Sequence, residues 1–441
     1  MKRFKIFFTF LSLLFIYSLI YSCNTNSCRF CNKKQQGAIF QNIRCKADTS
    51  ILYNIFVPSE TDTVLPLLIF LDPHGNTAFA LNKYSQLAEK HKIILAGFDA
   101  YYNGLPYNIV SKKFKIWFNE VYTNAPVDTT KIFLSGFSGG ARAISLLESE
   151  TKNVLATALC GAGPANLELW NTGKQPAMFF VGSSDFNYNE VISIFNNKNI
   201  RRTKSLCVFK DSHEWPNANL FEDFFILINR LSNKNTNIDE NIYISRAQEL
   251  VKSNRFDLAI NNISNAIFAI GAEKPSLNKL RDSLNLSITE EFKSKYNSNL
   301  IKEYTLQNRI YNYFQDLDTI KYFALLDSVR LSAKVDSFSL ESDVMNRIIG
   351  YCGILAYTFT KRAYDLQSNN LYNFLKIYEY TEPANIDMML FHTAYYAKNK
   401  NCILAKKFID MARANGLQNN DKRLNLFPEF NNCKELKWKY F

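Results

Sequence analysis

Residues 131–148 of the 441-residue chain read KIFLSGFSGGARAISLLE. The apolar run at 131–135 predicts a buried strand, and the pattern at 141–148 predicts a helix. Between them stands G-x-S-x-G, in which Ser138 is the central residue. A strand that turns this sharply into a helix holds the serine in strained backbone geometry and raises its hydroxyl above the sheet. We therefore predict that Ser138 is a nucleophile and that the amide of Gly139 donates to a developing oxyanion.

The sequence around this motif alternates short apolar runs with helical stretches. Most runs are continuous, as expected of strands buried on both faces of a parallel sheet. The predicted strands are 51–57, 66–71, 93–98, 131–135, 154–160, 177–181 and 206–209, and the predicted helices include 81–91, 141–148 and 220–231. We predict a doubly wound, mostly parallel α/β domain over residues 49–232.

A serine nucleophile needs a general base, and the chain contains four histidines: His74, His91, His213 and His392. His213 follows the strand predicted at 206–209, in a loop where a catalytic histidine is expected. His392 falls inside a predicted helix, where we expect a packed or surface side chain. His91 stands between two lysines, and we expect it to be solvated. We therefore predict His213 as the base.

The preferred acid is Asp185. It follows the strand predicted at 177–181 and a Gly-Ser-Ser turn, which places it at the carboxyl edge of the sheet, where open α/β folds build their sites. An acid there fixes the tautomer of His213 and stabilises the imidazolium. Asp211 is the alternative acid.

The loop after the strand predicted at 66–71 reads DPHGN at 72–76. In sheets with this kind of serine turn, a loop at this position supplies the second oxyanion amide. We assign that role to the backbone of Gly75 and Asn76. We expect His74 to orient the loop rather than to transfer protons.

With these residues in place, the segment resembles the polyhydroxybutyrate-depolymerase and feruloyl-esterase branch of the α/β-hydrolases. The resemblance covers about two fifths of the chain and rests on DPHG at 72–75, GFSGG at 136–140, Gly182 with Asp185, and HEWP at 213–216. The sequence departs from the family at 210–212, where KDS replaces a commonly Gly-rich stretch. The resemblance implies ester hydrolysis through an acyl-enzyme, and we expect neither a cofactor nor a metal ion.

The connection at 161–175 is too short for a large lid domain. We therefore expect an open cleft that takes a bulky or polymer-linked ester, such as an ester on a polysaccharide. Two alternatives stay open: a serine peptidase on the same fold, and a lipid-anchored binding or scaffold protein whose hydrolase domain is not catalytic.

Beyond a polar boundary at 232–239, helical periodicity without strand signals runs from residue 240 to residue 420. Two stretches share a spacing, because Ala247, Leu250, Phe256, Ala259, Ile263 and Ala266 recur in kind as Thr393, Tyr396, Cys402, Ala405, Ile409 and Ala412. This spacing resembles the tetratricopeptide pattern, although the Gly and Pro positions of that family are missing. We expect an all-α domain of stacked hairpins that can hold a protein partner, followed by a C-terminal tail at 421–441.

The N-terminus begins with basic residues, followed by an apolar run at 6–21 and then Ser22-Cys23. This order is typical of a bacterial export signal, and IYSC at 20–23 resembles a lipobox in which Cys23 is lipidated. An uncleaved anchor helix is the alternative. We predict an exported protein of the bacterial cell envelope, with an export signal at 1–23, a membrane anchor through the lipid on Cys23, and a tether at 24–48.

The remaining cysteines and the net charge bear on two further kinds of site, a metal site and a nucleic-acid-binding surface. Cys28 and Cys31 form a lone CxxC, for which we expect a local disulfide rather than a zinc site. Cys160, Cys207 and Cys352 fall in apolar segments and are expected to be buried. The formal net charge is +12, but the basic residues are spread along the chain and no nucleic-acid-binding motif is present. We therefore expect no nucleic-acid partner.

Overall fold

The computed structural model describes residues 28–234, 238–271, 274–419 and 421–436. They form two compact units, which we describe separately. The first consists of the described residues of Met1–Gly182, Asn187–Phe209 and Glu214–Ser287, and the second of those of Ser183–Phe186, Lys210–His213 and Ile288–Phe441. The predicted export signal and Cys23 lie outside the described residues. Within the described part of the chain, no helix combines the length and apolar character needed to cross a bilayer.

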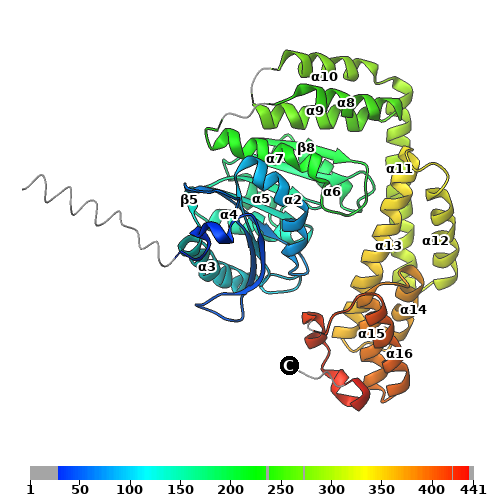
Figure 1. Cartoon of the computed structure of the whole chain (residues 1–441). Coiled ribbons are helices and arrows are strands. Elements are labelled where there is room, and N and C mark those ends of the chain that lie inside the picture. The colour runs from blue at the N-terminus through cyan, green and yellow to red at the C-terminus, as the bar shows by residue number, and fades with distance from the viewer. Residues whose placement is uncertain (1–27, 235–237, 272–273, 420, 437–441) are drawn as a thin grey trace, which may run out of the picture. The chain divides into compact units, whose positions relative to one another are not determined.

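An eight-stranded sheet forms the centre of the first unit (Figure 1). Its strands are β1 Ile39–Arg44, β2 Leu52–Phe56, β3 Leu65–Leu71, β4 Ile94–Phe98, β5 Val127–Phe137, β6 Val154–Cys160, β7 Ala177–Gly182 and β8 Lys204–Phe209. Their order across the sheet is β1-β2-β4-β3-β5-β6-β7-β8. Strand β2 pairs antiparallel with β1 and β4, and the other pairs are parallel. All seven predicted strands are confirmed, and the sheet is that of an α/β-hydrolase fold.

Helices cover both faces of this sheet, which explains why most of its strands contain continuous apolar runs. Leu67 and Ile69 of β3 pack into one core cluster, whereas Leu68 and Phe70 pack into another on the opposite face. The first cluster includes side chains of α3 Tyr107–Asn124, α4 Gly139–Glu150, α5 Leu167–Asn171 and α6 Tyr188–Asn196, and the second includes those of α2 Thr77–His91 and α7 Ala218–Leu231. The three predicted helices correspond to α2, α4 and α7.

The tether predicted at 24–48 is wrong for the residues of it that the structure describes, because 39–44 form the edge strand β1 and Phe30 is buried in the core of the first unit. A bulge between Phe40 and Ile43, with Asn42 at φ 55°, interrupts the pairing of β1 with β2. The extra residue breaks the two-residue alternation by which a half-buried strand is recognised in a sequence. Just before β1, the predicted disulfide between Cys28 and Cys31 is present, beside the short 3₁₀ helices η1 Arg29–Cys31 and η2 Lys33–Gln35.

The helical stretch begins inside the first unit, so the observed division differs from a domain boundary at residue 240. Helices α8 Glu240–Lys252, α9 Phe256–Ile270 and α10 Pro275–Ser287 belong to the same compact unit as the sheet. Helix α9 packs on β8, where the Asn262 amide donates to the Val208 carbonyl at 2.9 Å. The apolar stripe of α9, including Ala259 and Ile263, joins the core on that face of the sheet.

The second unit is helical, with its own core. Its helices are α11 Glu290–Asp316, α12 Thr319–Ala333, α13 Leu340–Asp365, α14 Leu371–Thr381, α15 Ile386–Lys398 and α16 Cys402–Ala414, followed by η3 Lys422–Leu426, η4 Pro428–Asn432 and η5 Lys434–Leu436. Consecutive helices pack together, including the predicted pair α15 and α16. Helices α11 and α13 have 27 and 26 residues, about twice the length of α14 to α16, so the repeat is not uniform. Membership of the tetratricopeptide family stays a prediction.

The C-terminal segment at 421–436 is not a free tail. Its side chains Phe427, Phe430 and Leu436 are buried in the core of the second unit. A disulfide between Cys402 and Cys433 joins the segment to the start of α16. Short 3₁₀ turns carry no long apolar period, and for this reason the sequence pattern did not reveal the packing.

Candidate active site

Ser138 lies where β5 ends and α4 begins, as predicted. Its backbone has φ 52° and ψ −120°, a conformation that residues other than glycine rarely adopt. The amide of Ser138 donates to the Cys160 carbonyl of the neighbouring strand at 2.8 Å, which holds the strained residue in register with the sheet. The strand, turn and helix therefore give G-x-S-x-G the context of a nucleophile elbow.

The glycines beside Ser138 are required by close backbone packing. A Cβ atom on Gly136 would lie 2.4 Å from the Gly140 carbonyl oxygen, and a Cβ on Gly140 would lie 2.2 Å from the Leu71 carbonyl oxygen. Both distances are far below a van der Waals contact, and both involve backbone atoms that cannot rotate away. The first turn of α4 can therefore approach β3 closely because no side chain intervenes.

The loop after β3 is organised by Asp72, which is buried. One oxygen of Asp72 accepts from the His74 amide at 2.9 Å, and the other accepts from the indole of Trp215 at 3.4 Å. The His74 ring is two-thirds exposed and lies 3.8 Å from the same carboxylate. The prediction that His74 orients this loop is therefore wrong, because Asp72 makes the contacts that hold it.

The predicted oxyanion donors differ in their local bonding. The Gly75 amide donates to the Asp72 carbonyl at 3.1 Å, so in this conformation it closes the turn of its own loop. Asn76 is the residue that precedes α2, and its carbonyl accepts from Phe79. Gly139 is the first residue of α4, where backbone amides have no acceptor within the helix. The oxyanion roles of Gly139 and Asn76 stay predictions, and so does that of Gly75, whose amide would first have to leave the Asp72 carbonyl.

The loop after β4 contributes residues that the sequence analysis missed. Asn103 places its side-chain oxygen where a Cβ of Gly139 would lie, at 1.8 Å, and accepts from the Tyr101 hydroxyl at 3.2 Å. Burial raises the pKa of Tyr101 to about 12, so this hydroxyl keeps its proton at neutral pH. The Asn103 amide also donates to the Pro73 carbonyl at 2.8 Å. The sequence did offer a signal for Asn103, because this residue lies just beyond the strand predicted at 93–98 and thus at the same edge of the sheet as Ser138.

Asp185 and His213 are brought together in the second unit. The Asp185 Oδ2 atom lies 2.9 Å from Nδ1 of His213. Asp185 is 1% exposed, whereas the His213 side chain is 22% exposed. The two loops that carry them, Ser183–Phe186 and Lys210–His213, are joined by a hydrogen bond from the Ser184 amide to the Asp211 carbonyl at 2.9 Å. The carboxylate of Asp211, the alternative acid, instead accepts from the adjacent Ser212 amide.

Each of the three predicted catalytic residues follows the end of a strand in the chain. Strands β5, β7 and β8 run parallel, and they end at Phe137, Gly182 and Phe209. Ser138, Asp185 and His213 follow those ends by one, three and four residues. All three therefore follow the carboxyl ends of strands, where α/β sheets place their sites.

The remaining histidines are structural. His392 is buried and stacked on Phe408 with ring centroids 4.2 Å apart, and burial lowers its pKa to about 4. His91 is buried rather than solvated, with Nε2 at 3.0 Å from Glu222 and Nδ1 at 2.8 Å from Asn229. Its lysine neighbours misled the interpretation because successive residues of a helix point in directions about 100° apart.

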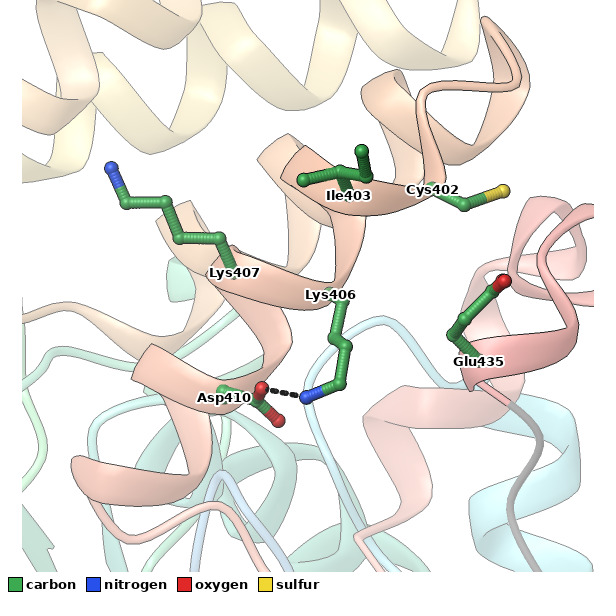
Figure 2. A pocket seen from close by; sticks show the side chains of 6 residues that line it. All are labelled: Cys402, Ile403, Lys406, Lys407, Asp410 and Glu435. Atoms are coloured by element: carbon green, nitrogen blue, oxygen red, sulfur yellow. Dashed lines mark hydrogen bonds and ion pairs between the residues drawn. The ribbon is translucent and has the colours of Figure 1, made fainter.

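A surface depression of about 330 Å³ lies in the second unit, between α16 and the C-terminal segment. Figure 2 shows its lining: Cys402, Ile403, Lys406, Lys407, Asp410 and Glu435. Lys406 forms an ion pair with Asp410. The sulfur atoms of Cys402 and Cys433 lie near the Glu435 carboxylate, but they form a disulfide and so are not thiolate ligands for a metal ion. None of the predicted site residues lines this depression.

Among the residues that the structure describes, the cysteines outside the disulfides are buried, as predicted for Cys160, Cys207 and Cys352. Burial raises the pKa of each of these thiols, to about 12 for Cys352. They are therefore protonated packing residues and not nucleophiles.

No protein-family model and no curated protein sequence matches this chain. Several solved structures are similar to it over less than half of its length. Est1E from Butyrivibrio proteoclasticus is 10% identical, with a TM-score of 0.35 over 44% of this chain and 97% of that one. A truncated carbohydrate esterase from gut microbiota is 12% identical, with a TM-score of 0.34 over 45% and 98%. A ferulic acid esterase is 12% identical, with a TM-score of 0.35 over 44% and 98%. The fold itself follows from the strand order and the serine turn: this chain has an α/β-hydrolase fold followed by a helical region.

Proposed function

We propose that this protein is a serine hydrolase, and specifically a carboxylic ester hydrolase, with Ser138, His213 and Asp185 as its catalytic triad. Two observations carry the proposal: the backbone of Ser138 is strained, and within the second unit a buried Asp185 faces His213. Strain of this kind is costly and is found where a side chain must be presented for chemistry. The roles of His213 as base and of Asp185 as its acid partner follow from the chemistry of a carboxylate that faces an imidazole nitrogen.

In the proposed mechanism, the Ser138 hydroxyl oxygen attacks the carbonyl carbon of the ester. Because Nδ1 of His213 faces Asp185, Nε2 is the ring atom that takes the serine proton and later gives it to the leaving alcohol. The Asp185 carboxylate holds the ring orientation and stabilises the imidazolium. The backbone amides of Gly139 and Asn76 are the proposed donors to the oxyanion, and each such donor typically lowers the barrier by about 3 kcal/mol. In the second half of the reaction, His213 takes a proton from water, whose oxygen attacks the acyl carbonyl; the bond to the Ser138 oxygen then breaks, His213 returns the proton to that oxygen, and the carboxylic acid leaves.

The proposed substrate is a bulky or polymer-linked ester, such as an acylated polysaccharide. Between β6 and β7 the chain forms one five-residue helix, α5, which supports a site without a lid domain in that connection. An exported, lipid-anchored protein of the bacterial cell envelope would meet such polymers directly. Lipidation of Cys23 and the export signal belong to the proposal, as does a protein partner for the helical region.

The experiment combines active-site labelling with substitution. Wild-type protein should react with a fluorophosphonate probe at Ser138 and hydrolyse a p-nitrophenyl ester. The Ser138→Ala and His213→Ala variants should each lose at least about 10⁴-fold in kcat while keeping the wild-type circular dichroism spectrum. Ser149→Ala is the matched control, because Ser149 is an exposed serine on the same helix α4.

Failure of the wild type to label would refute the catalytic proposal and favour a scaffold built on the same fold. A panel of acylated glycans, short esters and peptides then separates the substrate classes. Turnover of peptides without turnover of esters would favour the peptidase, and activity restricted to short soluble esters would remove the polymer-linked substrate.

A further inference from the structure

One face of helix α13 contacts both loops that carry the predicted acid and base. Asp343, Arg347 and Gly350 are spaced four and three residues apart, so they lie on the same side of the helix. The two loops, Ser183–Phe186 and Lys210–His213, belong to the same compact unit as α13. Each of the three α13 residues makes a different contact with them.

Asp343 joins the two loops to each other. Its side chain is 1% exposed and accepts a hydrogen bond from the Ser184 hydroxyl at 2.8 Å. The same oxygen forms an ion pair with the Lys210 ammonium. A buried carboxylate is costly unless it is paired, so this arrangement fixes both loops against α13. Ser184 immediately precedes Asp185, and Lys210 is three residues before His213.

Arg347 fixes the backbone of the acid loop. Its guanidinium donates to the Ser183 carbonyl at 2.5 Å. The charge is balanced by Glu303 of α11, which is fully buried and accepts from Arg347 at 2.6 to 3.1 Å. A planar guanidinium that is bonded to a carboxylate has little freedom to rotate. The hydrogen bond from Arg347 to the Ser183 carbonyl is therefore held in a fixed direction.

Gly350 brings the helix close to the histidine through Phe186. A Cβ atom at position 350 would lie 3.1 to 3.3 Å from atoms of the Phe186 side chain, so the absence of a side chain permits this packing. The Phe186 ring in turn lies against the His213 ring, with centroids 4.3 Å apart. The contact thus runs from α13 through Phe186 to the imidazole.

We infer that Asp343, Arg347 and Gly350 are positioning residues for the Asp185–His213 pair, which makes α13 a component of the catalytic machinery. This inference rests on the proposed hydrolase function. None of the three contacts a reacting atom; they act by holding the acid and the base in the geometry that proton transfer requires. Misplacement of a catalytic group by about 1 Å can cost about 100-fold in rate.

The test uses the full chain and two conservative variants. Asp343→Asn keeps the size and the acceptor oxygen but removes the charge that binds Lys210. Gly350→Ala adds one methyl group toward Phe186 at a helical position where alanine favours the helix, so it should fold even if a change at Asp343 does not. Glu341→Gln is the matched control, because Glu341 forms an exposed ion pair with Lys302 between the same helices α13 and α11.

We expect both variants to lower kcat on a p-nitrophenyl ester by about 10- to 100-fold, with KM within about twofold of the wild type. The acidic limb of the kcat/KM profile should also move to lower pH, because an imidazolium displaced from Asp185 is less stabilised. A purely structural role would change the unfolding midpoint without moving the pH profile. Glu341→Gln should leave kcat, KM and the pH profile unchanged.

The inference is overturned if both variants keep the wild-type kcat and pH profile, or if Glu341→Gln has the same effect as Asp343→Asn. Failure of the proposed function is distinguished by the wild type, which would then not label at Ser138. In that case ¹H–¹⁵N spectra of the histidine rings decide: a shift of the His213 titration midpoint in Asp343→Asn and Gly350→Ala, but not in the control, supports positioning, and an unchanged midpoint refutes it.

Discussion

The Asp185 carboxylate lies 2.9 Å from Nδ1 of His213 while its own side chain is almost fully buried. We predict that Asp185→Asn lowers kcat by about 10⁴-fold with little change in structure, because an amide favours the wrong imidazole tautomer and cannot stabilise the imidazolium. Steady-state kinetics on a chromogenic ester measure this loss.

Asp211→Asn is the control for that experiment. Asp211, the alternative acid, lies two residues before His213 in the sequence, but its carboxylate accepts from the Ser212 amide. Kcat within about threefold of the wild type is expected. An equal loss in both variants, or a mild loss in Asp185→Asn, would contradict the assignment of the acid.

Substitution by alanine should have different effects on stability at the two adjacent glycines that follow Ser138. Gly140→Ala should destabilise the protein by about 3 kcal/mol, at the upper end of overpacking effects, because its Cβ would meet the Leu71 carbonyl at 2.2 Å. Gly139→Ala should cost less, because its Cβ would meet side-chain atoms of Asn103 and the Tyr101 hydroxyl rather than backbone, and the Asn103 side chain can rotate. Urea unfolding measures both. Equal stability of the two variants would show that the approach of α4 to β3 is not the constraint.

The first unit could be predicted where local pattern and structure coincide. Apolar runs, most of them continuous, marked the seven strands β2 to β8. The serine turn was recognised because strand, glycines and helix are adjacent in the sequence. The edge strand β1 was missed because its bulge at Asn42 removes the alternation. The orienting role of Asp72 depends on Trp215, which lies 143 residues further along the chain.

The α13 contacts could not be read from the sequence for a similar reason. Asp343 and Arg347 look like ordinary charged residues of an amphipathic helix. Their burial depends on partners more than 130 residues away, Lys210 and Ser183. A periodic pattern reports which face of a helix is apolar, but it does not report which loops a buried charge meets.

The disulfide between Cys402 and Cys433 should stabilise the second unit. It closes a loop of 31 residues, for which chain entropy predicts about 3 to 4 kcal/mol. We predict that the double variant Cys402→Ser, Cys433→Ser lowers the thermal midpoint of that unit. The double variant Cys28→Ser, Cys31→Ser is the control and should have a smaller effect, because its loop spans three residues. Identical melting of the two variants would contradict the loop-length argument.

Asp223 of α7 gives a pH dependence to the packing of α9. Its Oδ2 atom accepts from the Asn265 amide at 2.7 Å, and complete burial raises the pKa of Asp223 to about 6. In the unfolded chain the same group titrates near 3.8. Between these values the folded state binds more protons, so its stability falls as the pH rises from about 4 to 6.

Replacing Asp223 with asparagine should therefore stabilise the protein above pH 6, by up to about 3 kcal/mol, and have little effect below pH 4. Urea unfolding at pH 4, 5, 6 and 7 measures the growing difference in the free energy of unfolding.

Glu222→Gln, one residue earlier, should change the free energy of unfolding in the opposite direction. The hydrogen bond with His91, supported by that with Lys90, lowers the pKa of Glu222 to about 2. Its stabilising contribution is present above the unfolded value near 4.5 and is lost as the pH falls toward 2, so the substitution should destabilise at pH 7. If Asp223→Asn destabilises the protein at pH 7, burial is not the dominant effect at Asp223, and if Glu222→Gln stabilises it, the hydrogen bonds of Glu222 are not.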